Sequence, residues 1–543
     1  MANVFGRMQK FISATIQSTL LLGLINAPAN ALNLKPIGTY NSGIFDEGAS
    51  EISAYDPITQ RLFVTNANAN TIDVLSISDP TNPSLLFNIN LNPYGGGVNS
   101  VAYSNNMFAV AVESAIAQDP GNVVFFNANG DFLNSVTVGA MPDMLTFTPD
   151  GKKVLVANEG EPNADYTVDP EGSVSIIDLF DFSVKTAGFN GVPVTGFVRQ
   201  FGPNATLAQD LEPEYIAVSA DGKKAWVTLQ ESNALGILDI ATGKFEKIVG
   251  LGFKDHSLAK NSLDASDRDN QINFATYPNL FGMYQPDAIA SYNVKGKTYL
   301  VTANEGDARD YDAFAEEARI SSLVLDPTAF PNAAELQKNP QLGRLQVTNT
   351  LGDTDGDGDF DELYVFGGRS FAIWDETGNL VFDSGNAFEK ITAERFPQFF
   401  NASNDDQQFD SRSDNKGPEP EGLTVAELNG RTYALIGLER IGGVMVYDIS
   451  DPVQPIFIDY VNSTRNFLGI PELGTAGDLG PEGLLFITAK NSPTGNPLLV
   501  ITNEISGSTT IYSASVPEPS AVLGLLVLSS FSLLGLKRKG LSS

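Results

Sequence analysis

Acidic side chains recur at two fixed points of a repeated pattern, and they are the residues of this chain best suited to do chemistry. One acid starts an apolar segment, and a second acid ends the next apolar segment. The first set is Glu51, Asp143, Glu214, Asp287, Glu421 and Glu482, and the second set is Glu113, Glu159, Glu231, Glu305, Glu439 and Glu504. Carboxylates that are forced close together either retain protons or bind cations. For any single acid the pattern favours a hydrogen-bonding role in the repeat, whereas the whole set is equally compatible with an acidic face that holds a divalent metal.

Two of these acids lie in longer polar loops that resemble each other. Residues 158–161 read Asn-Glu-Gly-Glu and residues 304–307 read Asn-Glu-Gly-Asp, and an Asp-Tyr pair follows each of them. A glycine behind the acid lets the backbone turn close to a ligand, and binding sites are often built on loops that follow rigid strands. Glu159 and Glu305 are therefore the best candidates for a functional metal. The alternative is two similar surface loops.

A third acidic feature is the run Asp-Thr-Asp-Gly-Asp-Gly-Asp-Phe-Asp-Glu at residues 353–362. Calcium takes six to eight oxygen ligands, and alternating acids with a glycine turn can wrap around it. The predicted ligands are Asp353, Asp355, Asp357, Asp359 and Asp361. The spacing resembles that of thrombospondin type 3 repeats and dockerins, but Tyr364 stands where an EF-hand has its last glutamate. We expect a structural calcium site here; the alternative is a solvated acidic turn.

The composition excludes several other kinds of chemistry. The chain has 543 residues with no cysteine and a single histidine, His256, so thiolate zinc sites and cysteine nucleophiles are excluded. A Ser-His-Asp triad is disfavoured for the same reason. With 65 acidic against 33 basic residues, the formal net charge is −32. Such a charge repels nucleic acid and anionic lipid and attracts divalent cations.

Short apolar segments separated by turns must position these acids. Each repeat unit has two or three β-branched segments, often with an Asp-Gly turn, as at residues 143–159 and 214–231. Repeats of this kind predict an all-β fold, a β-propeller over residues 32–515, in which residues 34–40 close the ring. Seven anchors are visible. Residues 363–365, 371–375 and 380–382 could add another blade, so the spacing favours eight blades over seven. Tandem β-sandwiches are the alternative.

The two ends of the chain are typical of export and sorting. Residues 1–31 have basic residues, an apolar stretch and an Ala-Asn-Ala cleavage pattern, which predicts a signal peptide; an amphipathic helix is the alternative. Residues 516–539 contain Pro517, Glu518 and Pro519, an apolar run and three basic residues. This order resembles the PEP-CTERM sorting signal. The resemblance implies a short, transient transmembrane anchor and cleavage by an exosortase; a plain tail anchor is the alternative.

Together these features resemble one family. The repeat core, the Asn-Glu-Gly loops, the Asp-rich run followed by Tyr-Val-Phe-Gly-Gly-Arg-Ser-Phe at 364–371, and the tail are similar to those of choice-of-anchor I proteins, which are related to the mesenchyme-specific cell surface glycoprotein group. The resemblance spans roughly residues 33–515. It implies a secreted propeller held by one of several anchors. It implies no settled activity, so no catalytic residue is assigned from it.

Two functions from different classes follow from the sequence. The first is a calcium-binding module displayed on or released from the cell surface, with an extracellular polymer or protein as its ligand and with signal peptidase and exosortase as processing partners. The second is a metal-dependent phosphatase-like or lactonase-like hydrolase on the acidic face. Propellers support both. The lack of a histidine network and of a glycine-lysine phosphate loop favours the binding module.

Overall fold

The computed structural model describes residues 32–516. Residues Leu34–Ala514 form one compact unit, and the description below concerns this unit alone. The predicted signal peptide (1–31) and the sorting residues Pro517, Glu518 and Pro519 lie outside the described residues. No helix within residues 32–516 is both long and apolar enough to cross a bilayer.

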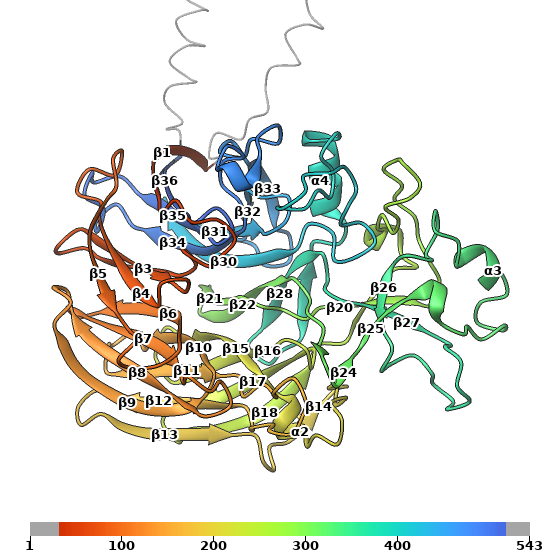
Figure 1. Ribbon diagram of the computed structural model, residues 1–543, viewed down its shortest axis with the longest axis horizontal. Helices are drawn as coiled ribbons and strands as arrows, with labels where there is room; N and C mark the ends of the chain where they lie inside the picture. Colours follow the sequence, from red (N-terminus) through yellow and green to blue (C-terminus); the bar gives the residue numbers. More distant parts are fainter. Residues whose placement is uncertain (1–31, 517–543) are drawn as a thin grey trace, which may run out of the picture. The chain divides into compact units, whose positions relative to one another are not determined.

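Seven sheets of four or five strands radiate from a common axis in the described part of the chain (Figure 1). Blade 1 is β2 (Ser53–Asp56), β3 (Arg61–Asn66), β4 (Thr71–Ser76) and β5 (Ser84–Asn90); blade 2 is β6 (Gly97–Ser104), β7 (Met107–Glu113), β8 (Pro120–Asn127) and β9 (Phe132–Ala140); blade 3 is β10 (Pro142–Phe147), β11 (Lys153–Asn158), β12 (Ser173–Asp178) and β13 (Ser183–Gly188). Blade 4 is β15 (Pro213–Val218), β16 (Lys224–Leu229), β17 (Ala234–Asp239), β18 (Lys244–Gly250) and β14 (Val194–Thr195), and it is preceded by the short helix α2 (Leu207–Asp210). The prediction of an all-β propeller is confirmed.

The other three blades complete the ring. Blade 5 is β21 (Ile289–Val294), β22 (Lys297–Asn304), β28 (Ser370–Asp375) and β29 (Leu380–Asp383), which is followed by helix α4 (Ala387–Arg395); blade 6 is β30 (Pro420–Leu428), β31 (Arg431–Leu438), β32 (Val444–Asp448) and β33 (Ile456–Val461). Blade 7 is β34 (Pro481–Ile487), β35 (Leu498–Asn503), β36 (Ser508–Ser515) and β1 (Asn33–Asn41). As predicted from residues 34–40, the first strand of the unit pairs with the last and closes the ring. The closure covers a sheet edge that would otherwise be exposed.

The eighth blade that the spacing favoured does not form. Residues 371–375 and 380–382 belong to β28 and β29, which are the two outer strands of blade 5, and residues 363–365 form β27 (Leu363–Val365). β27 pairs instead with β20 (Leu280–Met283), which also pairs with β19 (Phe253–Asp255). The wide interval between the anchors at 287 and 421 therefore comes from the segments between β22 and β28 and between β29 and β30, and not from another repeat.

The inserted segments build a satellite with a hydrophobic core of its own, at the right of Figure 1. Besides β19, β20 and β27 they contain β23 (Asp310–Tyr311), β24 (Phe314–Ala315), β25 (Glu317–Arg319), β26 (Gln346–Thr348) and helix α3 (Ala333–Leu336). Leu280, Leu345 and Val347 are fully buried there. Because these apolar side chains are buried within the inserted segments, the segments do not have to pack as a blade of the ring.

An irregularity at the start of several inner strands positions the acids. In blades 3, 4, 6 and 7 the pairing register shifts between a proline and the residue three positions later: Pro142/Leu145, Pro213/Ile216, Pro420/Leu423 and Pro481/Leu484. Each acid of the first set in these blades directly follows its proline, so it lies within the bulge. Proline cannot donate a ladder hydrogen bond, and bulges re-aim side chains. At Gly422 a Cβ atom would lie 1.7 Å from the Glu482 carbonyl oxygen, so only glycine allows this close approach between blades 6 and 7.

Candidate metal centre

The acids of the repeat gather at one end of the propeller axis, and in blades 3, 4, 6 and 7 the bulge places the first acid there. A narrow cavity of about 50 Å³ lies there, and every blade lines it: Ile52, Asn99, Ser100, Asp143, Met144, Tyr215, Asp287, Ala288, Gly422 and Glu482. We call this end the acidic mouth. Pro142 pairs with Asn158, Pro420 with Leu438 and Pro481 with Asn503, so the acid after each proline lies next to the acid after its partner.

Two trios of carboxylates form at the mouth, and each spans a boundary between blades. Asp143, Glu159 and Glu214 have carboxylate oxygens within 4.8 Å of one another, and so do Asp287, Glu305 and Glu421. In each trio the two acids of one blade meet the first acid of the next blade. The predicted pairing of Asp143 with Glu159 is therefore present, but a partner from the neighbouring blade joins it.

Other predicted acids lie near the mouth without entering these trios. Glu439 joins a further group with Glu305 and with Glu419, which the sequence analysis did not single out. Burial, and then the charge of Glu504, raises the pKa of Glu51 to about 8. Burial raises the pKa of Glu482 well above its usual range, and the charges of Glu51 and Glu504 add to this effect. The acids of blades 7 and 1 thus influence one another across that boundary.

The carboxylates of the first trio favour their neutral forms when no cation is bound. Burial raises the pKa of Asp143 to about 7, and the charges of Glu113 and Glu161 reinforce the shift. Burial also raises the pKa of Glu159 and of Glu214 well above the usual range, with further contributions from neighbouring carboxylates. These groups need either protons or a cation to offset their mutual repulsion.

Basic residues that were not predicted from the sequence lie beside the second trio, and one of them, Lys416, contacts Glu305 of the trio. Lys416 Nζ lies 2.6 Å from Glu305 Oε1 and 3.2 Å from Glu419 Oε2. Arg440 Nε lies 3.0 Å from Glu419 Oε2, and Arg412 also forms an ion pair with Glu419. Although burial opposes it, the charges of Glu305 and Glu419 hold the pKa of Lys416 well above its usual range. An ammonium group therefore sits among these carboxylates as a built-in counterion.

A buried arginine from the insertion pairs with two acids that precede Glu214 of the first trio in the chain. Arg309 Nη1 lies 2.6 Å from Asp210 Oδ1, and its Nη2 lies 2.7 Å from Glu212 Oε1; all three side chains are at most 3% exposed. A repeated motif could have pointed to the missed glutamates, because Glu-Pro-Glu occurs both at 212–214 and at 419–421. The two polar loops at residues 158–161 and 304–307 thus lie at equivalent places in blades 3 and 5. The acids around them pair with different basic residues, Arg309 in one case and Lys416 in the other.

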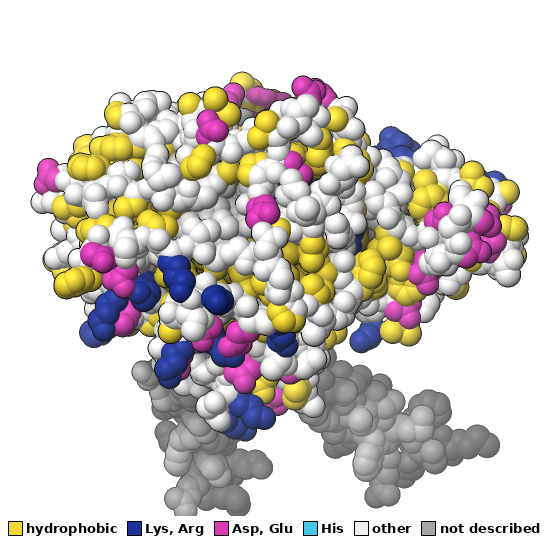
Figure 2. All heavy atoms as spheres, turned by 90° about the horizontal axis from the view of Figure 1, so that it is seen from below, with side chains coloured by type: hydrophobic (Ala, Val, Ile, Leu, Met, Phe, Trp, Pro, Cys, Tyr) yellow, Lys and Arg dark blue, Asp and Glu magenta, His cyan; other side chains and the backbone are white. Residues whose placement is uncertain are grey.

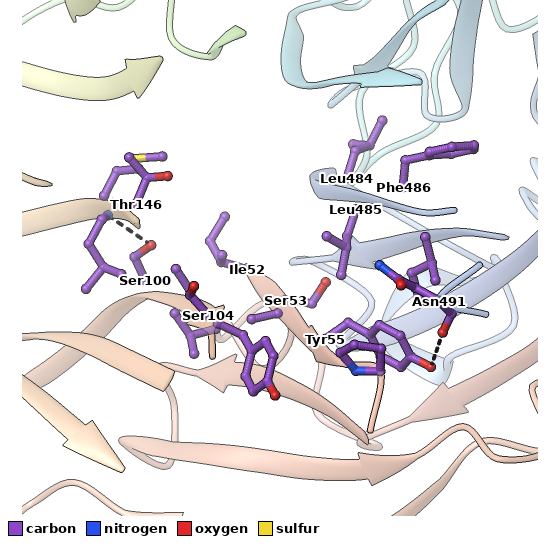
Figure 3. Close-up of a pocket in the computed structure, with 18 of the residues that line it drawn as sticks. Ile52, Ser53, Tyr55, Ser100, Ser104, Thr146, Leu484, Leu485, Phe486 and Asn491 are labelled. Carbon is purple, nitrogen blue, oxygen red and sulfur yellow. Dashed lines mark hydrogen bonds between the residues drawn. The ribbon is translucent and has the colours of Figure 1, made fainter. Parts of the chain in front are cut away.

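The channel widens at the end opposite the acidic mouth. A cavity of about 520 Å³ opens there, lined by residues that include Tyr55, Leu485 and Phe486, and none of its lining residues is charged. Figure 3 shows Tyr55 donating a hydrogen bond to the Asn491 carbonyl oxygen at 3.0 Å. Met144 and Tyr215 line both cavities. Of these two cavities, only the one at the acidic mouth is therefore lined by charged side chains.

The Asp-rich run lies on the inserted segment, as an exposed loop. The structure divides the five predicted ligands into two groups: Asp353, Asp355 and Asp357 lie together, while Asp359 and Asp361 lie with Asp326. Gly356 N and Gly358 N donate hydrogen bonds to Asp353, at 2.7 and 3.0 Å. The charge of Asp357 raises the pKa of Asp355. Figure 2 shows acidic side chains gathered over the inserted segment at the right of the view.

Comparisons with known proteins identify a matching family model and two similar relatives. The family model described as choice-of-anchor I domain matches residues 51–452. Gigasin-3a of Magallana gigas is 32% identical over 192 residues, which cover 33% of this chain and 66% of that protein. The mesenchyme-specific cell surface glycoprotein of Strongylocentrotus purpuratus is 30% identical over 317 residues, which cover 51% of this chain and 40% of that protein. The matches thus span less than two thirds of the length of either relative.

Solved structures share the architecture only loosely. Hydrazine synthase of Kuenenia stuttgartiensis has 13% identity and a TM-score of 0.45, over 88% of this chain and 99% of that chain. The β-propeller domain of Cps50 (Swd1) of Myceliophteria thermophila has 8% identity and a TM-score of 0.44, over 89% of this chain and 100% of that chain. At these scores the blade arrangement rests on the strand pairing described above.

Proposed function

The chain belongs to the choice-of-anchor I family, and from this premise we propose an exported, surface-associated β-propeller that binds divalent cations and serves as a binding or matrix module. Family membership and the relative named as a cell surface glycoprotein support the surface location. Its ligand in this proposal is an extracellular polymer or protein. The strongly acidic composition argues against nucleic acid as a partner.

The observation that carries the proposal is the trio of Asp143, Glu159 and Glu214 at the acidic mouth. Their carboxylate oxygens lie within 4.8 Å of one another, and neighbouring acids, not bases, dominate their electrostatic surroundings. Calcium and other hard cations prefer such all-oxygen sites. The deciding experiment is isothermal titration of residues 32–515 with calcium and manganese, first with the unchanged protein and then with Glu159→Gln combined with Glu214→Gln. Loss of a binding event in the variant is the expected result.

Calcium is also expected to stabilise the protein through the Asp-rich loop. Binding to the folded state alone adds roughly 2.7 kcal/mol when the free ion is about 100-fold above its Kd. Melting in calcium and in chelator should therefore differ, and Asp355→Ala with Asp357→Ala should reduce that difference. The matched control is Asp310→Ala with Asp312→Ala, since these two acids are also exposed on the insertion. An unchanged calcium shift in the loop variant would show that the loop is not the site.

We further propose that the chain is processed near Pro517, Glu518 and Pro519 in a host that has an exosortase. The expected product ends near these residues, because the anchor serves only until cleavage. Mass spectrometry of the mature C-terminus from displayed protein measures this directly. Recovery of an intact Lys537–Lys539 tail on surface-displayed protein would reject the sorting-signal interpretation.

A metal-dependent hydrolase is the second candidate function. It is favoured by the proximity of Lys416 to Glu305, since a cationic side chain beside a metal could bind an anionic substrate. If this candidate is right, a screen of phosphoesters and lactones with calcium, manganese or zinc finds turnover, and Glu159→Gln and Glu305→Gln each abolish it. The binding module predicts no turnover to lose. Retained folding by circular dichroism is the control for both variants.

A further inference from the structure

Two sets of five carboxylates at the acidic mouth correspond one to one. In one set the acids come from blades 3 and 4 and the segment between them, and in the other they come from blades 5 and 6 and the segment between them. The blade 3–4 set is Asp143, Glu159, Glu212, Glu214 and Glu231, and the blade 5–6 set is Asp287, Glu305, Glu419, Glu421 and Glu439. Each set contains the Glu-Pro-Glu motif and one trio with oxygens within 4.8 Å. The same local chain path therefore builds both.

The two sets differ in their basic residues. The blade 5–6 set has three basic neighbours: Lys416, Arg412 and Arg440 all form ion pairs with Glu419. Lys416 also forms an ion pair with Glu305 of the trio. The blade 3–4 set has one basic neighbour, Arg309, which forms ion pairs with Glu212 and with Asp210, an acid outside the set. No basic side chain among the described residues forms an ion pair with Asp143, Glu159 or Glu214. The two sets thus contain the same number of acids but have different numbers of basic neighbours.

Each set has a buried carboxylate oxygen without a partner in the described part of the chain: Glu231 Oε2, outside the trio, in the blade 3–4 set, and Glu421 Oε2, within the trio, in the blade 5–6 set. Glu231 is 3% exposed, and its Oε2 has no hydrogen-bond partner among the described residues. Its charge adds to the pKa increase that burial causes in both Glu159 and Glu214, so it lies near both carboxylates. A buried carboxylate oxygen without a partner is costly unless a ligand satisfies it. In the blade 5–6 set, Glu439 is equivalent to Glu231, and it forms an ion pair with Arg440.

We infer that Asp143, Glu159 and Glu214 hold one divalent cation between blades 3 and 4, and that the Lys416 ammonium group fills the equivalent position between blades 5 and 6. This inference rests on the proposed cation-binding function and narrows it to one occupied position. The ligand class is a hard divalent ion such as calcium or manganese, because every available donor is an oxygen.

Counting ions at the mouth tests the inference, with manganese as the probe. The protein is residues 32–515 with Asp355→Ala, Asp357→Ala, Asp359→Ala and Asp361→Ala, which removes both acidic groups of the exposed loop from the count. Bound manganese is measured from the loss of the free-ion signal in electron paramagnetic resonance. We expect one ion per chain in this background, none after Asp143→Asn with Glu159→Gln, and still one after the matched change Asp287→Asn with Glu305→Gln.

Removal of the lysine gives the opposite, gain-of-binding test. Lys416→Met should raise the count from one ion to two, because the second trio then lacks its ammonium group while Arg412 and Arg440 still neutralise Glu419. Lys416→Gln is the second variant, in case the methionine variant does not fold. A count that stays at one in folded lysine variants would overturn the role given to Lys416.

The remaining outcomes separate the inference from the proposed function. If manganese binds to the background but is lost only with Asp287→Asn and Glu305→Gln, the assignment to the first trio is wrong while cation binding at the mouth stands. If the background binds no manganese, both the inference and the proposed function of the mouth are wrong.

Discussion

Without added cations, the free energy of unfolding is expected to fall as the pH rises from about 5 to about 8. Burial, with neighbouring charges, raises the pKa of Asp143 and Glu231 to about 7 and that of Glu51 and Glu439 to about 8, from ordinary values of 3.8 for Asp and 4.5 for Glu. At a pH below the ordinary values these groups are protonated in both states. Between the ordinary and the raised values the unfolded chain releases protons that the folded chain keeps, so stability falls with pH and levels off above the raised values.

The expected loss is large because several groups contribute. Each pKa unit corresponds to about 1.4 kcal/mol, so a group of coupled acids can remove several kcal/mol across this window. Bound cation should reverse the trend, since it replaces the protons and favours the ionised forms. Urea unfolding at a series of pH values, with manganese and with chelator, measures both effects.

Neutral variants provide the control for this pH dependence. Asp143→Asn with Glu231→Gln should flatten the profile in chelator and reduce the stabilisation by manganese. The exposed pair Asp310→Asn with Asp312→Asn should leave the profile unchanged. A flat profile of the unchanged protein in chelator would contradict the expected repulsion at the mouth.

Replacing Arg309 by methionine is expected to destabilise the fold by about 3–5 kcal/mol, as for other buried ion pairs that lose one partner. Arg309 holds Asp210 and Glu212 at 2.6 and 2.7 Å, and all three side chains are almost fully buried. Removing it leaves two buried carboxylates uncompensated. Because Arg309 lies in the insertion and both acids precede blade 4, the change should also loosen the insertion from the ring.

An exposed ion pair gives the matched control. Arg395 lies 3.1 Å from Asp459, and the two side chains are 48% and 43% exposed. Arg395→Met should cost less than about 1 kcal/mol, because solvent screens such pairs. Chemical unfolding of both variants measures the difference. Equal losses in the two variants would show that burial does not govern the contribution of Arg309.

Much of the fold could be predicted from the residue pattern, because it depends on local order along the chain. Alternating apolar segments and turns indicate antiparallel blades. Within one blade, the register places the acid after Pro142 beside the acid after Asn158. The closing strand at residues 34–40 was also predictable, since a propeller must cover its last edge. The pairing of Asp143 with Glu159 follows from these local rules alone.

Contacts between distant segments were decided only by the tertiary structure. Lys416 reaches Glu305 across 111 residues of sequence, and Arg309 reaches Asp210 across 99. No spacing rule predicts such contacts, because they depend on how the insertions return to the ring. The blade number was wrong for the same reason: the apolar residues at 363–365 bury themselves in the satellite core and not in an eighth blade. The sequence by itself thus determined the repeat and the acids it carries. The closed ring decided which acids meet across a blade boundary, and the long-range basic residues decided which of them are left without a counterion.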